Sequence, residues 1–303
     1  MTTNERVAYF NGQIIPESQA CISIRDTGFT YGNGVFDAAR TFNGQIFKLT
    51  EHVNRLFHSL KYVDLDIGLS PDEVIQLTLE VTEQNLPLLG PNEDYWVFHR
   101  VSGGPNDPLA AMTSPTVVIE CTPLPLKARS PLYRDGMDVA FPSVRRIPPE
   151  CLSPNVKSSN YLNLTIAHNE VQEHSPGAWA VLLDTRGFIC EGLGSNPFLV
   201  RNGKIYTPKG QYVLEGISRQ TVIELANKLK IPVVEDDITP FDAYRADEAF
   251  ITSTSLCVCP VRSFSKKPLQ DEAIPGPITQ KLTEAFSQLV DCDFVGQYLA
   301  QLG

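Results

Sequence analysis

The sequence predicts an α+β fold, because hairpin strands and amphipathic helices follow one another without strict alternation. Three Asn-Gly pairs, at residues 11–12, 43–44 and 202–203, each stand between short apolar runs, the pattern of tight β-hairpins. No fixed period links them, so they indicate separate hairpins and not a repeat architecture. At 303 residues, 42% hydrophobic and 20% charged, the chain is long enough for two domains with their own cores.

The first third of the chain is expected to contain two helices. A stripe of apolar residues in 50–62 predicts an amphipathic helix with Thr50 as its N-cap. A second helix is predicted to begin after Ser70, where Pro71 takes the first helical position and Glu73 completes a capping box.

Strands surround these helices in the prediction. Residues 35–40, 95–101 and 116–121 are rich in β-branched and aromatic residues. The polar, Gly- and Pro-rich connection at 102–115 is long enough to be a functional loop. Residues 122–131 have the composition of an interdomain linker. We therefore predict a small domain at 1–121, this linker, and a larger domain at 132–303.

The larger domain is expected to mix strands and helices. Its predicted strands are 136–141, 178–184 paired with 188–190 in a hairpin, 232–235 and 249–255. Its predicted helices are 161–167, 216–230 and 278–289, with the last one ending the chain.

Charge and composition exclude several classes of partner. The formal net charge of −10 and the lack of a basic stripe argue against nucleic acid and anionic membrane as partners. The N-terminus has no signal pattern and no apolar run approaches 18 residues, so we expect a cytoplasmic protein. The seven cysteines form no Cys-x-x-Cys pair and the five histidines no ligand spacing, so neither disulfides nor a metal site are expected.

Lys157 is the strongest candidate for a catalytic side chain. It follows Pro148, Pro149 and Pro154, which favour an extended approach, and precedes the helical pattern that begins at Tyr161. A lysine in such a loop is usually an exposed surface residue. Placed in a site that partly buries it, the same amine could act as a covalent catalyst.

Two further motifs support that interpretation. The run Glu191-Gly-Leu-Gly-Ser-Asn196 begins 34 residues after Lys157, and Leu214-Glu-Gly-Ile-Ser-Arg219 stands where a helix is predicted to begin. The three motifs in this order resemble the class IV (fold-type IV) pyridoxal-phosphate aminotransferases, which include the branched-chain, D-amino-acid and (R)-amine enzymes. The resemblance extends from about Tyr9 to the C-terminus.

The resemblance implies pyridoxal 5'-phosphate as cofactor and assigns residues to it. Lys157 would be the catalytic residue that forms the Schiff base and moves a proton at the substrate Cα. Glu191 would keep the ring nitrogen protonated, as an electron-withdrawing ring requires. The other cofactor-binding residues would be Tyr161 at the ring oxygen, Leu214 beneath the ring, and Arg55, Ile217, Ser218 and Thr254 at the phosphate.

The same resemblance implies a substrate pocket between the two domains, in a homodimer whose 102–115 loop closes the neighbouring subunit's site. Its expected residues are Tyr31, Phe36, Ala38, Arg40, Tyr95, Val97 and Ser255. Branched-chain enzymes carry Tyr-x-Arg where this chain has Tyr95-Trp96-Val97, and D-amino-acid enzymes carry an Arg-x-His pair that is missing from 104–108. Strand alternation puts Tyr95, Val97 and His99 on one face and Arg100 on the other.

Without either carboxylate trap, the sequence favours transfer of an amino group from an (R)-amine to a 2-oxo acid, with possible D-amino-acid activity. Arg40 is then the candidate to hold the acceptor. The alternatives are an L-branched-chain aminotransferase, an aminodeoxychorismate lyase that releases pyruvate, and a non-catalytic pyridoxal-phosphate-binding protein. The presence of both Lys157 and Glu191 counts against the last of these.

Overall fold

The computed structural model describes residues 5–106, 114–271 and 273–302, and the chain divides into two compact units. The first unit runs to Leu124 and also includes Val156–Asn160, whereas the second comprises Pro125–Asn155 and the chain from Tyr161 onward. Both units mix helices with strands, as the sequence predicts. The division differs from the predicted one because the segment around Lys157 packs with the first unit.

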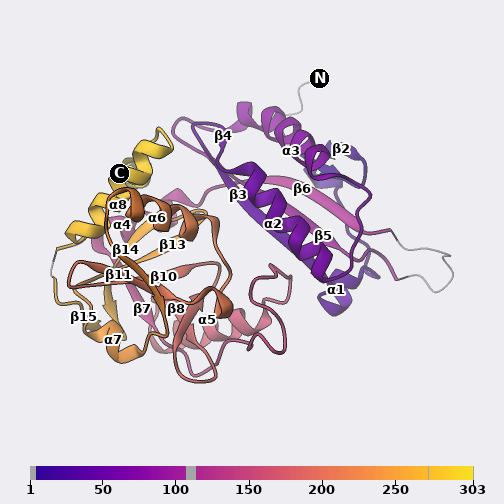
Figure 1. Ribbon diagram of the computed structural model, residues 1–303. Coiled ribbons are helices and arrows are strands. Elements are labelled where there is room, and N and C mark those ends of the chain that lie inside the picture. The colour runs from indigo at the N-terminus through magenta and orange to yellow at the C-terminus, as the bar shows by residue number, and fades with distance from the viewer. Residues whose placement is uncertain (1–4, 107–113, 272, 303) are drawn as a thin grey trace. The chain divides into compact units, whose positions relative to one another are not determined.

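The first unit is built on a six-stranded antiparallel sheet (Figure 1). Its strand order is β2-β1-β6-β5-β3-β4. The bounds are β1 Val7–Phe10, β2 Gln13–Pro16, β3 Gly34–Phe42, β4 Gln45–Ile46, β5 Tyr95–Ser102 and β6 Thr116–Pro123. The predicted Asn-Gly hairpins β1–β2 and β3–β4 are confirmed. Their turn residues have positive φ, +46° and +96° in the first and +51° and +78° in the second, as the tight hairpin turn requires.

Two long helices cover one face of this sheet (Figure 1). Helix α3, Pro71–Asn85, starts with the predicted capping box of Ser70 and Glu73. Helix α2, Leu49–Tyr62, buries Val53, Leu56 and Leu60, but the predicted cap at Thr50 is wrong. Lys48 is the N-cap, and its left-handed conformation (φ +48°) starts the helix early enough that Thr50 already lies in the first turn. A short helix that the sequence analysis missed, α1, spans Thr27–Tyr31.

The second unit contains a nine-stranded mixed sheet. Its strand order is β12-β11-β10-β13-β14-β7-β8-β9, with β15 on β14. The bounds are β7 Met137–Ala140, β8 Trp179–Leu183, β9 Ile189–Gly192, β10 Asn196–Arg201, β11 Lys204–Pro208, β12 Val233–Asp236, β13 Glu248–Ser253, β14 Cys257–Phe264 and β15 Lys267–Pro268. The hairpins β8–β9 and β10–β11 are confirmed. Strand β9 ends the order but also contacts β10 and β11, so the sheet curls back on itself.

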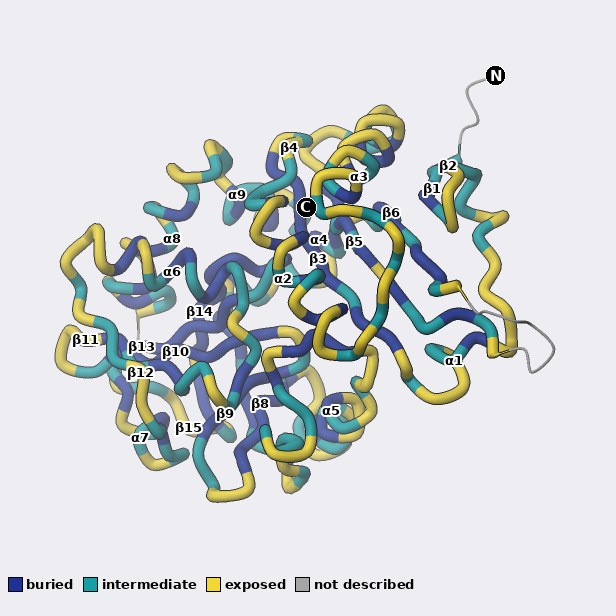
Figure 2. The backbone as a smooth tube through the Cα atoms, turned by 45° about the vertical axis from the view of Figure 1, so that its right-hand side comes forward, coloured by how far each residue is buried: buried dark blue, intermediate teal, exposed yellow. Residues whose placement is uncertain are grey.

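Helices α4, α5, α6 and α8 of this unit pack against strands of the sheet, which are largely buried, and α9 packs against α4 (Figure 2). The helices of this unit are α4 Leu126–Asp135, α5 Leu162–His174, α6 Ile217–Lys228, α7 Pro240–Tyr244, α8 Pro277–Leu289 and α9 Phe294–Leu299. Four short 3₁₀ turns complete the described elements at Glu17–Gln19, Leu86–Leu88, Gly210–Tyr212 and Ala300–Leu302. The prediction that the 278–289 helix ends the chain is wrong, because α9 follows it.

The segment 122–131, predicted as an interdomain linker, contains the division between the two units after Leu124 and carries regular secondary structure. Strand β6 extends to Pro123, and α4 begins at Leu126 despite having Pro131 in its interior. A proline cannot donate a backbone hydrogen bond to the carbonyl four residues earlier. Here the hydroxyl of Ser130 donates to that carbonyl, on Lys127, at 2.9 Å, so the helix continues through the proline.

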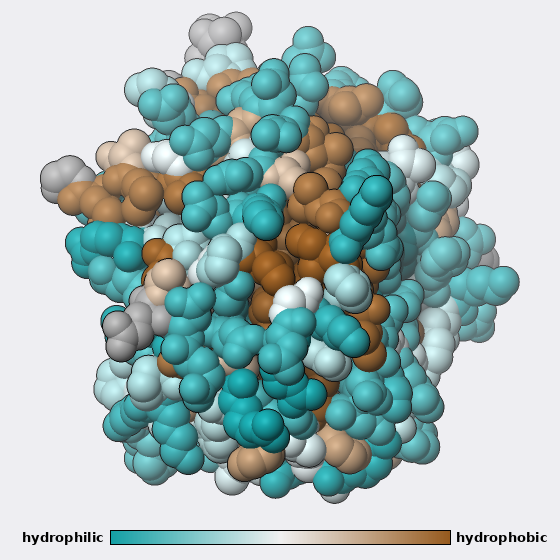
Figure 3. Space-filling model, turned by 60° about the vertical axis from the view of Figure 1, so that its left-hand side comes forward, coloured by the Kyte–Doolittle hydropathy of each residue, from teal (hydrophilic) through white to brown (hydrophobic). Residues whose placement is uncertain are grey.

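The described part of the chain has no helix long and apolar enough to cross a membrane. The face drawn in Figure 3 carries many hydrophilic side chains with apolar ones exposed among them.

Candidate active site

Lys157 is held in the first unit by backbone contacts to α2 and β3. Its backbone N–H donates to the hydroxyl of Ser59 at 3.2 Å, and its carbonyl accepts from the N–H of Phe36 at 2.9 Å. The residue is 9% exposed, and Nζ lies 4.6 Å from the centre of the Phe36 ring. The structure therefore brings together two predicted site residues, a partly enclosed amine and the aromatic ring beneath it.

A buried charge network lies next to this lysine segment. Asp37 on β3 accepts hydrogen bonds from Arg55 at 2.8 and 2.9 Å and contacts Nδ1 of His52 at 2.6 Å. Burial raises the pKa of Asp37, but the positive charge of Arg55 and the hydrogen bonds from Arg55 and His52 more than offset this and hold the pKa well below its usual range. Asp37 is therefore a carboxylate that orients Arg55, the residue expected at the cofactor phosphate.

The prediction that Tyr95 and Val97 line the substrate pocket is wrong. Both are in the hydrophobic core beneath α2 and α3, with 1% and 0% of their surface exposed. The Tyr95 hydroxyl donates to the carbonyl of Asn85 at the end of α3. Strand alternation was correctly predicted, but it turns this set of side chains toward the helices.

The opposite face of the sheet carries the side chains that accompany Phe36. Across the β3–β5 pair, Phe36 lies opposite Arg100, Ala38 opposite Phe98, and Arg40 opposite Trp96. Directly opposed residues of antiparallel strands point to the same face. The sequence analysis did not predict Trp96 and Phe98 as site residues. They precede Arg100 by four and two residues, so strand alternation places all three on the face that carries Phe36.

Arg40 does not have the predicted role of holding an acceptor. It is 1% exposed, its guanidinium lies 4.0 Å from the centre of the Phe42 ring, and its Nε donates to the carbonyl of Thr41. Asp94, also buried, lies 3.8 Å from Nη2. Because the protein encloses this guanidinium, it is not accessible to a bound acceptor.

Two other predictions for the first unit concern its surface. Tyr31, at the end of α1, is 73% exposed. The proposed functional loop at 102–115 lies mostly outside the described residues, since 107–113 are not among them.

In the second unit, Glu191 on β9 is held by two donors. Nε of Arg146 donates to one carboxylate oxygen at 2.8 Å, and the backbone N–H of Leu214 donates to the other at 2.8 Å. Glu191 is 5% exposed and Arg146 is largely buried. The arginine was missed because nothing in the sequence separates it from its neighbour Arg145.

The segment from Leu214 leads directly into the first turn of α6. Gly216 is the N-cap, and no side chain caps the helix. A Cβ at Gly216 would lie 2.4 Å from Oδ1 of Asn196, so the close approach of these segments requires glycine. The uncapped N–H groups at Ile217 and Ser218 suit an anion such as phosphate. Within the second unit, Glu191, the predicted partner of the ring nitrogen, is thus bonded to the segment that leads into the predicted phosphate-binding turn of α6.

A turn after β13 carries the remaining predicted residues, Thr254 and Ser255. The hydroxyl of Ser218 donates to the carbonyl of Ser253 at 3.0 Å, which ties this turn to the start of α6. Strand β13 ends at Ser253, so both predicted residues lie in the turn and not on the strand. Tyr161 is the N-cap of α5.

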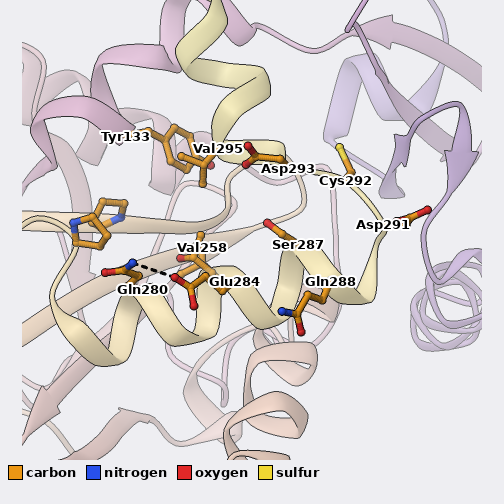
Figure 4. Close-up of a pocket in the computed structure, with 13 residues that line it drawn as sticks. Tyr133, Val258, Gln280, Glu284, Ser287, Gln288, Asp291, Cys292, Asp293 and Val295 are labelled. Carbon is orange, nitrogen blue, oxygen red and sulfur yellow. Dashed lines mark hydrogen bonds between the residues drawn. The ribbon is translucent and has the colours of Figure 1, made fainter.

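A separate cavity of about 680 Å³ lies among α8, the start of α9 and β14 (Figure 4). Gln280 and Glu284 of α8 are hydrogen bonded to each other on one of its walls. None of the predicted site residues lines it.

Comparison with known proteins identifies the family. The model of the class IV amino-transferases matches residues 34–264. A "Putative branched-chain-amino-acid aminotransferase" of Methanocaldococcus jannaschii is 38% identical, with 93% of this chain and 95% of that protein covered. A D-alanine aminotransferase of Staphylococcus aureus is 27% identical over 93% and 97% of the two chains. The chain belongs to the class IV aminotransferases and is a transaminase.

Solved structures agree with this assignment and with the fold predicted from the resemblance. A branched-chain aminotransferase of Thermoproteus uzoniensis superposes with a TM-score of 0.84 at 30% identity, covering 98% of this chain and 97% of that one. The branched-chain amino acid aminotransferase of Escherichia coli gives a TM-score of 0.83 at 27% identity, covering 94% of each chain. Class IV aminotransferases use pyridoxal 5'-phosphate and act on amino and keto acids.

Proposed function

We propose that this transaminase takes an amino group from an (R)-amine, with D-amino acids as further donors, and passes it to a 2-oxo acid such as pyruvate. Pyridoxal phosphate, when bound, supplies the electron-withdrawing ring that makes the substrate Cα–H acidic. Lys157 would move the proton at Cα, and Glu191 would hold a proton on the ring nitrogen. Arg55 and the first turn of α6 would bind the phosphate, with Tyr161, Leu214, Ser218 and Thr254 completing the cofactor contacts.

The observation that carries the choice of donor is the character of the sheet face that includes Phe36. Its aromatic side chains, Phe36, Trp96 and Phe98, suit an apolar group. Of its arginines, Arg40 is enclosed beside Asp94, and Arg100 donates to Glu120 at 3.0 and 3.2 Å. A carboxylate on the donor would have to compete with these carboxylates for a guanidinium, whereas an uncharged substituent would pack on the rings.

The test compares three donors in single-turnover reactions with the enzyme loaded with cofactor. (R)-1-phenylethylamine, D-alanine and L-leucine are mixed in parallel, and loss of the absorbance of the bound cofactor is followed. We expect the (R)-amine and D-alanine to react faster than L-leucine. Fast reaction with L-leucine and none with the (R)-amine would contradict the proposal and favour an L-branched-chain aminotransferase.

The lyase alternative predicts a different product. An aminodeoxychorismate lyase would release pyruvate from its substrate without an amino acceptor. Assaying pyruvate in the absence of any 2-oxo acid separates this activity from transamination.

We also propose that the enzyme is a cytoplasmic homodimer. Ile22, Ile24, Phe29 and Tyr31 of the first unit are 54%, 81%, 76% and 73% exposed, and exposed apolar side chains grouped along the sequence suit burial in a subunit interface. Light scattering of the purified enzyme would report the mass, and a monomer would contradict this assignment.

A further inference from the structure

Arg129 of helix α4 is a partly buried cation beside the Ser253–Leu256 turn. One of its Nη atoms donates a short hydrogen bond to the hydroxyl of Ser255, and its guanidinium lies 5.8 Å from the centre of the Trp179 ring. Burial lowers the pKa of Arg129, and the neighbouring Tyr298 and Tyr133 partly offset this lowering. An arginine nevertheless keeps its charge in proteins, so this turn is adjacent to a fixed positive charge.

The turn itself is rigidly held. The hydroxyl of Tyr298 donates to the carbonyl of Ser255 at 2.5 Å, and that of Tyr133 donates to the carbonyl of Leu256. The N–H of Leu256 donates to the hydroxyl of Ser253 at 3.0 Å. Since Ser218 also binds this turn, Arg129 is connected through it to the first turn of α6.

The indole of Trp179 links Arg129 to the segment that contains Glu191. Nε1 of Trp179 donates to the hydroxyl of Ser195 at 2.9 Å, and Ser195 pairs with Gly192 next to Glu191. Arg129 therefore contacts two elements, the Ser255 turn and Trp179, which are in turn bonded to the two predicted cofactor-binding segments of this unit.

We propose that Arg129, together with the hydroxyl of Ser255, binds the carboxylate of the 2-oxo-acid acceptor. This inference rests on the proposed function and replaces Arg40 in the role of acceptor anchor. A guanidinium has five N–H donors in a planar fork that matches a carboxylate, and Ser255 can turn its hydroxyl to donate as well. An amine donor without a carboxylate leaves the Arg129–Ser255 contact intact, so one site serves both halves of the reaction.

The test uses Arg129→Gln in the full-length enzyme carrying the aminated cofactor. Its reaction is followed with pyruvate and with acetophenone, which lacks a carboxylate. We expect the pyruvate concentration for half-maximal rate to rise about 10- to 100-fold, as for loss of a charge-assisted hydrogen bond. The rate at saturating pyruvate and the acetophenone reaction should change by less than about threefold. Arg129→Lys, which keeps the charge but not the fork, should restore part of the pyruvate affinity.

Arg134→Gln is the matched control, because Arg134 is on the same helix but exposed and paired with Asp135. Equal losses with pyruvate and acetophenone, or no change with either, would overturn the proposal and leave Arg129 a structural residue. If Arg129→Gln does not fold, Arg129→Lys is tested instead. A loss with pyruvate that exceeds the loss with acetophenone supports the proposal, and equal losses overturn it. A wild-type enzyme that ignores acetophenone would contradict the proposed donor class, while the pyruvate series would still test Arg129.

Discussion

Arg55 and Asp37 form a two-bond ion pair, 2.8 Å from Nε to Oδ2 and 2.9 Å from Nη2 to Oδ1, in which the carboxylate is fully buried. This ion pair fixes the orientation of the Arg55 guanidinium. We therefore expect Asp37→Asn to lower the free energy of unfolding by about 3–5 kcal/mol, because it leaves a largely buried cation uncompensated. Urea denaturation of the enzyme without cofactor would measure this loss.

The same variant should also lose cofactor faster on dialysis, since Arg55 is the expected phosphate ligand. Asp135→Asn is the control, because Asp135 forms an exposed pair with Arg134 that should contribute less than about 1 kcal/mol. Equal unfolding midpoints for the two variants would show that the Asp37 pair has no special role.

Lys157→Ala should abolish transamination while the fold survives. The side chain is the expected proton-transfer group at the substrate Cα, and such groups contribute about 10²–10⁴-fold to rate. The backbone contacts of Lys157 to Ser59 and Phe36 do not need the side chain, so circular dichroism should be unchanged. Lys209→Ala is the control, as that lysine pairs with Asp236 and Asp237 on the surface. Turnover that persists in Lys157→Ala would assign the chemistry to another lysine.

Arg146→Gln should slow the reaction without removing Glu191. Loss of the charge-assisted bond to one carboxylate oxygen leaves Glu191 with the N–H of Leu214 as its donor among the described residues. A penalty of about 1.5–3 kcal/mol corresponds to roughly 10- to 100-fold in rate. Single-turnover rates with a saturating donor would measure it. Arg186→Gln, at a half-exposed arginine paired with Asp184, should leave the rate unchanged. A wild-type rate in Arg146→Gln would remove Arg146 from the site.

His99 predicts a specific loss of stability in acid. Burial lowers its pKa from 6.5 to about 4, and its Nδ1 has no hydrogen-bond partner among the described residues. The unfolded chain binds the proton at a higher pH than the folded one. The contribution of uncharged His99 to the free energy of unfolding is therefore complete above about pH 6.5 and is lost progressively toward pH 4. The full loss is about 3 kcal/mol.

The measurement compares the wild type with His99→Gln at several pH values. Burial also lowers the pKa of His52, but both proteins retain His52, so its contribution cancels in the comparison. The free energy of unfolding should fall less steeply between pH 6.5 and 4 in His99→Gln. Parallel curves would mean that His99 stays uncharged in both states or charged in both.

Local signals in the sequence predicted most of the elements. The Asn-Gly hairpins and the Ser70 capping box were found because a turn or cap depends on a few adjacent residues. The predicted Thr50 cap is wrong, and helix α4 was not predicted, because both outcomes depend on conformation and not on residue type. Lys48 adopts a left-handed φ, and the hydroxyl of Ser130 supplies the hydrogen bond that Pro131 cannot donate.

The site shows the same limit at longer range. Lys157 and Glu191 were proposed from motifs, but the residues that orient them, Ser59 and Arg146, lie 98 and 45 positions away and have no motif of their own. Tyr95 and Val97 were correctly placed on one face of a strand. Which face meets the helices depends on how α2 and α3 pack, and strand periodicity carries no information about that.

The position of Val156–Asn160 also determines how this protein can be dissected. The chain leaves the first unit at Leu124, returns at Val156 to pair Ser158 with Val35, and leaves again after Asn160. A single cut near residue 124 would therefore give an N-terminal fragment without the lysine segment and a C-terminal fragment in which that segment has lost its partners β3 and α2. Independent expression of the first unit would require a circular permutation or a grafted linker that carries residues 156–160 back to β3.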